Sequence, residues 1–126
     1  MIICSFDVGF TCGICRYDTV SDTFDLWSVP LEDIYKFIFY PICKSDVAIV
    51  ERMPKYNTQS SIQTALTFIS GIFSERKCPQ IEIAPSTWKP IAKKRKWKAE
   101  EAKTDHEQDA YCLCKYFIEF YKERYE

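Results

Sequence analysis

Four side chains in this sequence have the types and positions expected of a divalent-metal site. Asp7 and Glu51 each directly follow a short, mostly apolar run, while His106 and Asp109 are three residues apart and would share a face on a helix. Acids gathered in one pocket repel one another, and their pKa values rise unless a cation neutralises them. Carboxylates with one imidazole suit Mg²⁺ or Mn²⁺ better than Zn²⁺. Because two such ions can activate a water and stabilise a leaving oxygen, these residues indicate phosphodiester cleavage.

The hydrophobic pattern predicts the elements that must position these residues. If the strands that precede Asp7 and Glu51 are parallel neighbours, both acids lie at the carboxyl edge of one sheet, where α/β proteins place their chemistry. The predicted strands, of which the first three suit an antiparallel meander, are 2–6, 12–17, 24–29, 47–50 and 81–84. The predicted helices are one between Pro30 and Pro41, one over 57–75, a short one from Pro85, and a last one from Thr104 to about Glu123.

The last predicted helix begins with Thr104-Asp105-His106-Glu107, the pattern of a capping box in which Glu107 reaches back to the cap. His106 and Asp109 then lie in the first two turns, where the positive end of the helix dipole stabilises a carboxylate. Asp105, four residues before Asp109, is an alternative ligand to His106. The competing interpretation is ordinary structure, in which each acid is a solvated strand end and the His/Asp pair only caps a helix.

A basic segment lies between the second acid and the last helix. Six of the ten residues from 89 to 98 are basic, and we expect all six to contact DNA: Lys89, Lys93, Lys94, Arg95, Lys96 and Lys98. Trp88 and Trp97 flank or interleave them. Such a patch neutralises phosphates and makes binding salt-dependent, but it implies no base-specific readout. A solvated basic loop or a localisation signal is the alternative.

Length and composition limit the class of protein. With 126 residues, 47% of them hydrophobic, the chain fits a single domain over 1–126, and its net charge of −1 does not by itself indicate nucleic-acid binding. It shows no signal peptide and no apolar run of transmembrane length. We therefore expect an intracellular, reducing compartment, no membrane partner, and seven cysteines that act as small core residues. Cys12 and Cys15 form a lone C-x-x-C, which we interpret as packing.

The predicted helix over 57–75 is the candidate surface for a homodimer. Its apolar positions match helical spacing and are Ile62, Ala65, Leu66, Ile69, Ile72 and Phe73. Gly71 lies inside this helix, where glycine costs stability relative to alanine. A close approach of a second helix would explain the glycine, and so would simple tolerance.

Four segments, in this order along nearly the whole chain, resemble motifs of the RuvC-like Holliday junction resolvases, especially the forms found in poxviruses, other large DNA viruses and phages. They are Ile3–Gly9, Ala48–Pro54, Pro85–Lys89 and His106–Ala110. The resemblance implies an α/β protein with the RNase H-like fold, a five-stranded mixed sheet with flanking helices. It also implies a homodimer that makes Mg²⁺-dependent paired nicks in four-way DNA junctions during recombination and repair, in the host-cell cytoplasm for a viral protein.

The resemblance also assigns roles to residues. It implies that two Mg²⁺ ions, with Mn²⁺ as a substitute, are held by the catalytic set Asp7, Glu51, His106 and Asp109. The chain departs from the family at Pro54, where members commonly carry an aromatic residue used at the junction centre; Tyr56 is the nearest substitute for contacting DNA. Lys98 and Lys103 are alternatives for a second basic role. The competing functions are an RNase H-like nuclease acting on flaps or RNA–DNA hybrids, and a non-catalytic junction-binding protein.

Overall fold

The computed structural model of the chain describes residues 1–37, 44–53 and 59–126. Within these ranges the strands form one five-stranded sheet, and they are β1 (Ile2–Asp7), β2 (Thr11–Asp18), β3 (Thr23–Pro30), β4 (Val47–Glu51) and β5 (Gln80–Ile83). The strand order is β3-β2-β1-β4-β5. β1, β2 and β3 pair antiparallel as the predicted meander, whereas β4 pairs parallel with both β1 and β5. The predicted five-stranded mixed sheet with flanking helices is confirmed.

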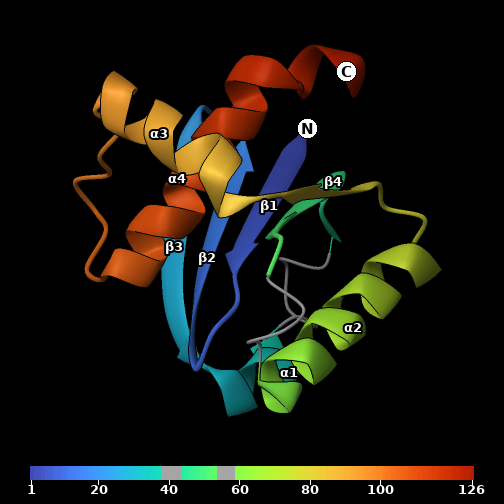
Figure 1. The fold of residues 1–126 in the computed structure, drawn as a ribbon. Helices are drawn as coiled ribbons and strands as arrows, with labels where there is room; N and C mark the ends of the chain where they lie inside the picture. The colour runs from blue at the N-terminus through green and yellow to red at the C-terminus, as the bar shows by residue number, and fades with distance from the viewer. Residues whose placement is uncertain (38–43, 54–58) are drawn as a thin grey trace.

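Helices cover both faces of this sheet (Figure 1). One layer contains the 3₁₀ turn η1 (Leu31–Asp33), α1 (Ile34–Phe37) and α2 (Ser60–Glu75). The other layer contains α3 (Pro85–Arg95) and α4 (Asp105–Phe120), followed by the 3₁₀ turn η3 (Lys122–Arg124). None of the described helices combines the length and the apolar character needed to cross a bilayer.

The alternation of side chains along each strand creates two separate cores, because successive strand residues point to opposite faces. Even-numbered residues of β1 and β4, such as Phe6 and Val50, pack in the core beneath α2. Odd-numbered residues, such as Ile3 and Ile49, pack in the core beneath α3 and α4. The face of the sheet on which a residue near the end of β1 or β4 lies therefore follows from its number.

The C-x-x-C pair is divided between these two cores. Cys12 packs beneath α2 and Cys15 beneath α4, because residues three apart on a strand face opposite sides. The six cysteines that the structure describes are buried free thiols, and burial raises the pKa of Cys4 to about 12. The interpretation of Cys12 and Cys15 as packing residues therefore agrees with the structure, while the reducing compartment stays a prediction.

The observed helix ends differ from the predicted ones in three places. The predicted helix after Pro30 starts as a 3₁₀ turn and continues as α1 to Phe37, beyond which it lies outside the described residues. α2 begins at Ser60 rather than at position 57, with Gln59 as its N-cap. α4 ends at Phe120 rather than near position 123, because the chain turns there into η3.

Candidate active site

The first two predicted acids lie side by side at the carboxyl edge of the sheet. β1 and β4 are parallel with Phe6 opposite Val50, so Asp7 and Glu51 are the next pair along. Both have odd numbers, and both therefore point to the face that α3 and α4 cover. The apolar residues of β1 and β4 are buried in the sheet, and each strand ends at its acid, Asp7 or Glu51.

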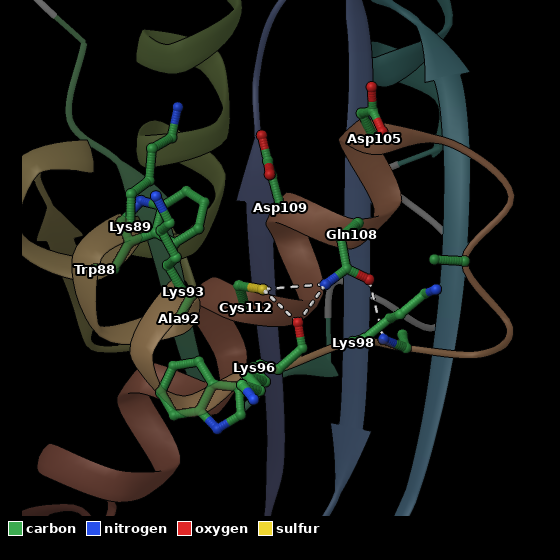
Figure 2. A pocket seen from close by; sticks show the side chains of 13 residues that line it. Trp88, Lys89, Ala92, Lys93, Lys96, Lys98, Asp105, Gln108, Asp109 and Cys112 are labelled. Carbon is green, nitrogen blue, oxygen red and sulfur yellow. Dashed lines mark hydrogen bonds between the residues drawn. The ribbon is translucent and has the colours of Figure 1, made fainter.

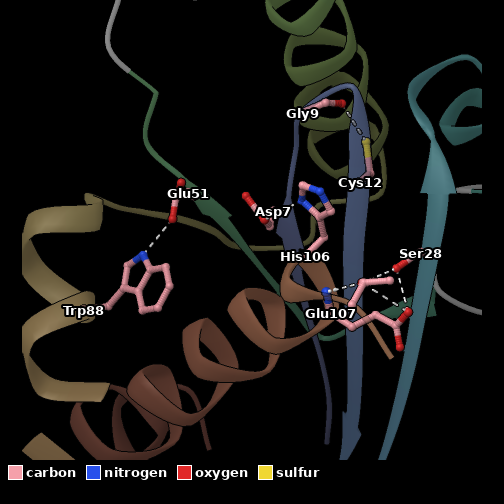
Figure 3. A network of polar contacts seen from close by, with 9 residues as sticks. Asp7, Gly9, Cys12, Ser28, Glu51, Trp88, His106 and Glu107 are labelled. Atoms are coloured by element: carbon pink, nitrogen blue, oxygen red, sulfur yellow. Dashed lines mark hydrogen bonds and ion pairs between the residues drawn. The ribbon is translucent and has the colours of Figure 1, made fainter. Parts of the chain in front are cut away.

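Glu51 is held in place by an indole. The residue is only 7% exposed, and its Oε2 accepts a hydrogen bond from Nε1 of Trp88 at 2.8 Å (Figure 3). Burial, together with repulsion from Asp7, raises the pKa of Glu51 to about 7, although the Trp88 hydrogen bond and Lys89 act in the opposite direction. Near neutral pH this group is therefore poised between its two protonation states.

Asp7 contacts the imidazole of the last helix. Its Oδ2 lies 3.5 Å from Nδ1 of His106 (Figure 3). Burial raises the pKa of Asp7, and the charge of Asp109 adds to this effect, while His106 and Lys89 lower it. The prediction that the start of α4 faces the ends of β1 and β4 agrees with this arrangement.

Asp109 completes the acidic set. Burial raises its pKa, and the nearby Lys89 and His106 lower it. Asp105, the alternative ligand, is exposed, and its charge is the weakest of the influences on the pKa of Asp109. His106 contacts Asp7, and the choice between His106 and Asp105 as a metal ligand stays a prediction.

A glycine in β2 allows α4 to lie this close to the sheet. Gly13 pairs with Asp7 across the β1–β2 ladder and points to the same face. A Cβ atom at Gly13 would collide with the backbone carbonyl of His106. The first turn of α4 therefore rests directly on the backbone of β2, which brings His106 to Asp7.

The other side of the same turn is tied to β3. Ser28 is the partner of Gly13 across the β2–β3 ladder, and its Oγ donates to Oε2 of Glu107 at 2.6 Å. The Thr104 hydroxyl accepts from the Glu107 N–H at 3.1 Å, as predicted for the cap. Glu107 also reaches back to the cap as predicted, because its Oε2 accepts from the Thr104 hydroxyl at 3.4 Å. Its Oε1 accepts in addition from the N–H of Lys103, one residue earlier, at 3.3 Å.

Sequence reasoning misses the roles of three residues, namely Gly13, Ser28 and Trp88. A glycine inside a buried strand is a recognised sign of close backbone approach, and Gly13 carries that sign. The Ser28–Glu107 bond joins positions 79 residues apart, and no local pattern indicates it. The sequence pattern indicates Trp88 only as a neighbour of the basic segment, although an indole N–H that is buried usually has a partner.

The donor set fits a hard divalent cation better than any other common group. It offers several carboxylate oxygens and one imidazole, which is the chemistry that Mg²⁺ and Mn²⁺ accept. The raised pKa values of Asp7, Glu51 and Asp109 are the expected mark of carboxylates crowded into a buried site. In the present side-chain positions, no three His, Cys, Asp or Glu residues of the described ranges are close enough to ligate one ion.

The predicted basic segment is divided by the geometry of α3. The groove between α3 and α4, which also contains Asp105 and Asp109, is lined by four of its lysines: Lys89, Lys93, Lys96 and Lys98 (Figure 2). Lys94 and Arg95 do not line this groove, and Arg95 pairs with Glu119 at 2.5 Å. Of the two alternatives for a second basic role, Lys98 lines the groove and Lys103 does not. Tyr56 lies outside the described residues.

Comparison with solved structures identifies the same fold in junction resolvases. The chain is similar to Thermus thermophilus RuvC, with a TM-score of 0.72 and 14% identity over 99% of this chain and 98% of that one. It is also similar to the fowlpox virus Holliday junction resolvase, with a TM-score of 0.54 and 22% identity over 94% and 99% of the two chains. A complex of the fowlpox virus resolvase with substrate Holliday junction DNA matches at a TM-score of 0.58 and 17% identity, over 100% of both chains. No protein-family model and no curated protein sequence matches the chain.

These likenesses cover nearly the whole chain and confirm the RNase H-like, RuvC-type fold that the motifs predicted. At such low sequence identity they show the fold and not the activity.

Proposed function

We propose that this protein is a metal-dependent DNA endonuclease of the RuvC-like resolvase family that resolves four-way junctions by paired nicks. The observation that carries the proposal is the convergence of Asp7, Glu51 and Asp109, from three different elements, at the carboxyl edge of a RuvC-type sheet. Each acid alone is an ordinary strand end or helix residue. A role as strand end or helix cap does not account for their burial together, with Asp7 and Asp109 both adding to the effect of burial on the pKa of Glu51.

In this proposal Asp7, Glu51, His106 and Asp109 would hold two Mg²⁺ ions, with Mn²⁺ as a substitute. When bound, such ions activate a water and stabilise the leaving oxygen in phosphodiester cleavage. Trp88 lies outside this set and prepares the site by fixing one oxygen of Glu51, while within the set His106 contacts Asp7. Orientation of a ligand by such outer partners is commonly worth 10- to 100-fold in metal affinity or activity, as an order of magnitude.

Lys89 is the lysine whose charge acts on all three acids of the site. Its charge lowers the pKa of Asp7, Glu51 and Asp109. Its ammonium also lies 5.5 Å from the centre of the Trp88 ring. A cation in this position would bind the phosphate being cut, whereas Lys93, Lys96 and Lys98 lie along the adjoining groove and would contact neighbouring phosphates.

We also propose a homodimer, because two symmetric nicks require two active sites. The apolar stripe of α2 is not available for this purpose, since Ile62, Ile69 and Phe73 are buried in the chain's own core. The exposed side of α2 is the remaining candidate, and Gly71 lies there with open space, free of other atoms within 4 Å, where a Cβ would stand. Gly71 therefore serves no close contact within the described part of the chain.

The dimer has its own test at this glycine. Gly71→Arg should leave the fold intact, because the space is open, but should convert a dimer into monomers when measured by sedimentation at micromolar concentration. Gly71→Ala is the matched control for the change in helix propensity. A monomeric wild-type protein, or an unchanged dimer in Gly71→Arg, would contradict a dimer through this helix.

The activity is tested with four substrates of matched sequence: a four-way junction, a linear duplex, a flap and an RNA–DNA hybrid. The proposal predicts Mg²⁺-dependent, symmetric nicking of the junction well ahead of the other three. Faster cutting of the flap or the hybrid would favour the related RNase H-like nuclease instead. Tight junction binding without any cutting would favour a non-catalytic junction-binding protein.

The role of the acids is tested with Asp7→Asn. This change keeps the shape of the side chain and removes the charge, so junction binding should survive. The cleavage rate should fall by at least about 100-fold, because losing a ligand should cost more than losing an outer partner of a ligand. Glu82→Gln is the matched control. Glu82 is an exposed acid on the neighbouring strand β5 and pairs with Arg52 at 3.4 Å, and its loss should leave cleavage unchanged.

A further inference from the structure

The groove between α3 and α4 extends from the proposed metal site over a lining that this site largely leaves unused. Its volume is about 730 Å³, within the range of roughly 300–1,000 Å³ typical of small-molecule sites. It is lined by α3, by α4 and by the segment 96–102 that connects them. Its lining includes Lys89 and Asp109, so the groove reaches one of the proposed metal ligands (Figure 2).

Much of the groove lining is apolar and includes a half-buried indole. Trp97 lines it together with Ala92, Ala99, Ala102 and Cys112. An aromatic ring next to small apolar side chains is suited to stacking against a nucleobase. Because every base has a flat π-face, a platform of this kind accepts all four bases.

The central polar side chain of the groove is already occupied by the protein. Gln108 accepts from the N–H of Ala99 at 2.9 Å, and its Nε2 donates to the carbonyl of Trp97 at 2.8 Å and to Sγ of Cys112 at 3.3 Å (Figure 2). These three bonds fix the segment that carries Trp97 against α4. The amide of Gln108 is therefore not free to read the edge of a base, which again favours a site that tolerates different bases.

Lysines surround this apolar lining. Lys89, Lys93 and Lys96 recur at helical spacing along and just beyond α3, and Lys98 follows in the connecting segment. Among the described residues none of these four ammonium groups has an ion-pair partner, whereas the neighbouring Arg95 pairs with Glu119. Unpaired cations around an apolar lining complement a nucleotide, which has negative phosphates and a flat apolar base.

We propose that this groove binds the nucleotide that adjoins the scissile phosphate, with its base unstacked from the junction and seated against Trp97, and with its phosphates facing the lysines. This inference rests on the proposed function, because it requires a DNA strand whose phosphate lies at the acids. Extruding a base costs the least where pairing or stacking is already interrupted, and a branch point offers that condition. The groove would thereby favour cutting near the junction over cutting in continuous duplex.

The test combines a missing base with a missing indole. After the cut position is mapped, junctions are made with an abasic nucleotide on one side or the other of the scissile phosphate, and single-turnover rates are measured for wild type, Trp97→Ala and Trp97→Phe. Removing the base on one side should slow the wild-type enzyme by about 5- to 100-fold, the range for loss of one base–aromatic stack. The abasic site on the other side is the matched control and should have little effect.

The decisive comparison is the combination of the two changes. Trp97→Ala should slow cutting of the intact junction by a similar factor and cause no further loss on the sensitive abasic junction, while Trp97→Phe should recover most of the rate. Ala102→Trp, which fills the groove from the connecting segment, should slow cutting of the intact junction but not of the abasic one. This second variant keeps the test decisive if Trp97→Ala does not fold.

Each remaining outcome counts against the inference. Two results would contradict the nucleotide site and leave the proposed nuclease activity unaffected. In the first, wild type cuts the junction and neither abasic site slows it. In the second, Trp97→Ala and the abasic site slow cleavage independently, so that their combined effect is the product of the two. If wild type cuts no junction at all, both the proposed function and the nucleotide site fail.

Discussion

The two faces of the sheet are built from the same strands and end differently at the carboxyl edge. Beneath α2, β1 and β4 finish with Phe6 and Val50, and this core is apolar to its end. Beneath α3 and α4, the same strands finish with Asp7 and Glu51. The position of each acid along its strand decides which helix layer covers it, because a shift of one residue would move every side chain to the opposite face. Structure and chemistry are thus separated across a single sheet.

The largest expected contrast between the two faces is at their glycines. Gly13→Ala should destabilise the protein by more than the roughly 1–3 kcal/mol typical of overpacking, because the new Cβ meets the backbone of His106 rather than a flexible side chain. Gly71→Ala, on the α2 layer, meets nothing within 4 Å and should stabilise the helix by up to about 1 kcal/mol. Urea unfolding of both variants measures this contrast. Equal and small effects would show that α4 does not rest on β2.

The next contrast is between two buried hydrophobic positions. Trp88→Phe keeps an aromatic ring and removes the N–H that Glu51 accepts from, so cleavage should fall by about 10- to 100-fold, as for other outer partners of metal ligands. Ile69→Val, in the core beneath α2, should cost about 0.5–1.5 kcal/mol of stability and leave the rate of folded enzyme unchanged. Cleavage rates are compared at a temperature where both variants are folded. An unchanged cleavage rate in Trp88→Phe would show that the indole N–H has no role in the site.

The acids should also make the response to Mg²⁺ depend on pH. The pKa of Glu51 is raised from 4.5 to about 7 in the folded protein, so the folded chain binds a proton more tightly than the unfolded chain does. Without metal, this contribution favours the folded state below about pH 4.5 and is lost as the pH rises through 7. Asp7 and Asp109 shift in the same direction.

Added Mg²⁺ should consequently raise the Tm more at pH 8, where the carboxylates are charged, than at pH 6. Thermal unfolding with and without the ion at the two pH values measures this difference. Glu51→Gln, which cannot titrate, should reduce it, and Glu82→Gln should not. An equal effect of Mg²⁺ at both pH values in the wild type would contradict the assignment.

The smallest expected effect concerns the tie between α4 and β3. Ser28→Ala removes the hydroxyl that donates to the buried Glu107 at 2.6 Å. Hydrogen bonds to charged groups contribute about 1.5–3 kcal/mol, and Glu107 keeps other donors, so the loss in stability should be about 1 kcal/mol. The cleavage rate should fall less than in Trp88→Phe. A larger loss of cleavage than in Trp88→Phe would mean that Ser28 acts on the site itself.

Much of the site could be predicted from the sequence because its parts are local. An acid directly after a buried apolar run lies at the end of a strand, and His106 and Asp109 share a helix face through their spacing of three. Lys89, Lys93 and Lys96 also follow helical spacing, so the sequence already contains the division of the basic segment. We predicted one continuous basic patch and did not use this spacing. In the structure, Lys94 and Arg95 do not line the groove that the other four basic residues line.

The parts that could not be predicted depend on contacts between distant elements. The partner of Glu107 is a serine on β3, and a capping pattern alone contains no information about it. The burial of Trp88 against Glu51 requires knowing that α3 follows β5 back over the same face of the sheet. The dimer and the contact of Tyr56 with DNA stay predictions.

The proposed function depends on one metal site beneath α3 and α4, formed by acids from β1, β4 and α4. The most direct measurement is the anomalous difference density of crystals soaked in Mn²⁺, collected from protein that cuts junctions. We expect peaks bounded by oxygens of Asp7, Glu51 and Asp109, and we expect these peaks to be lost in Asp7→Asn crystals. Peaks elsewhere, or peaks that survive in Asp7→Asn, would contradict the proposed metal site.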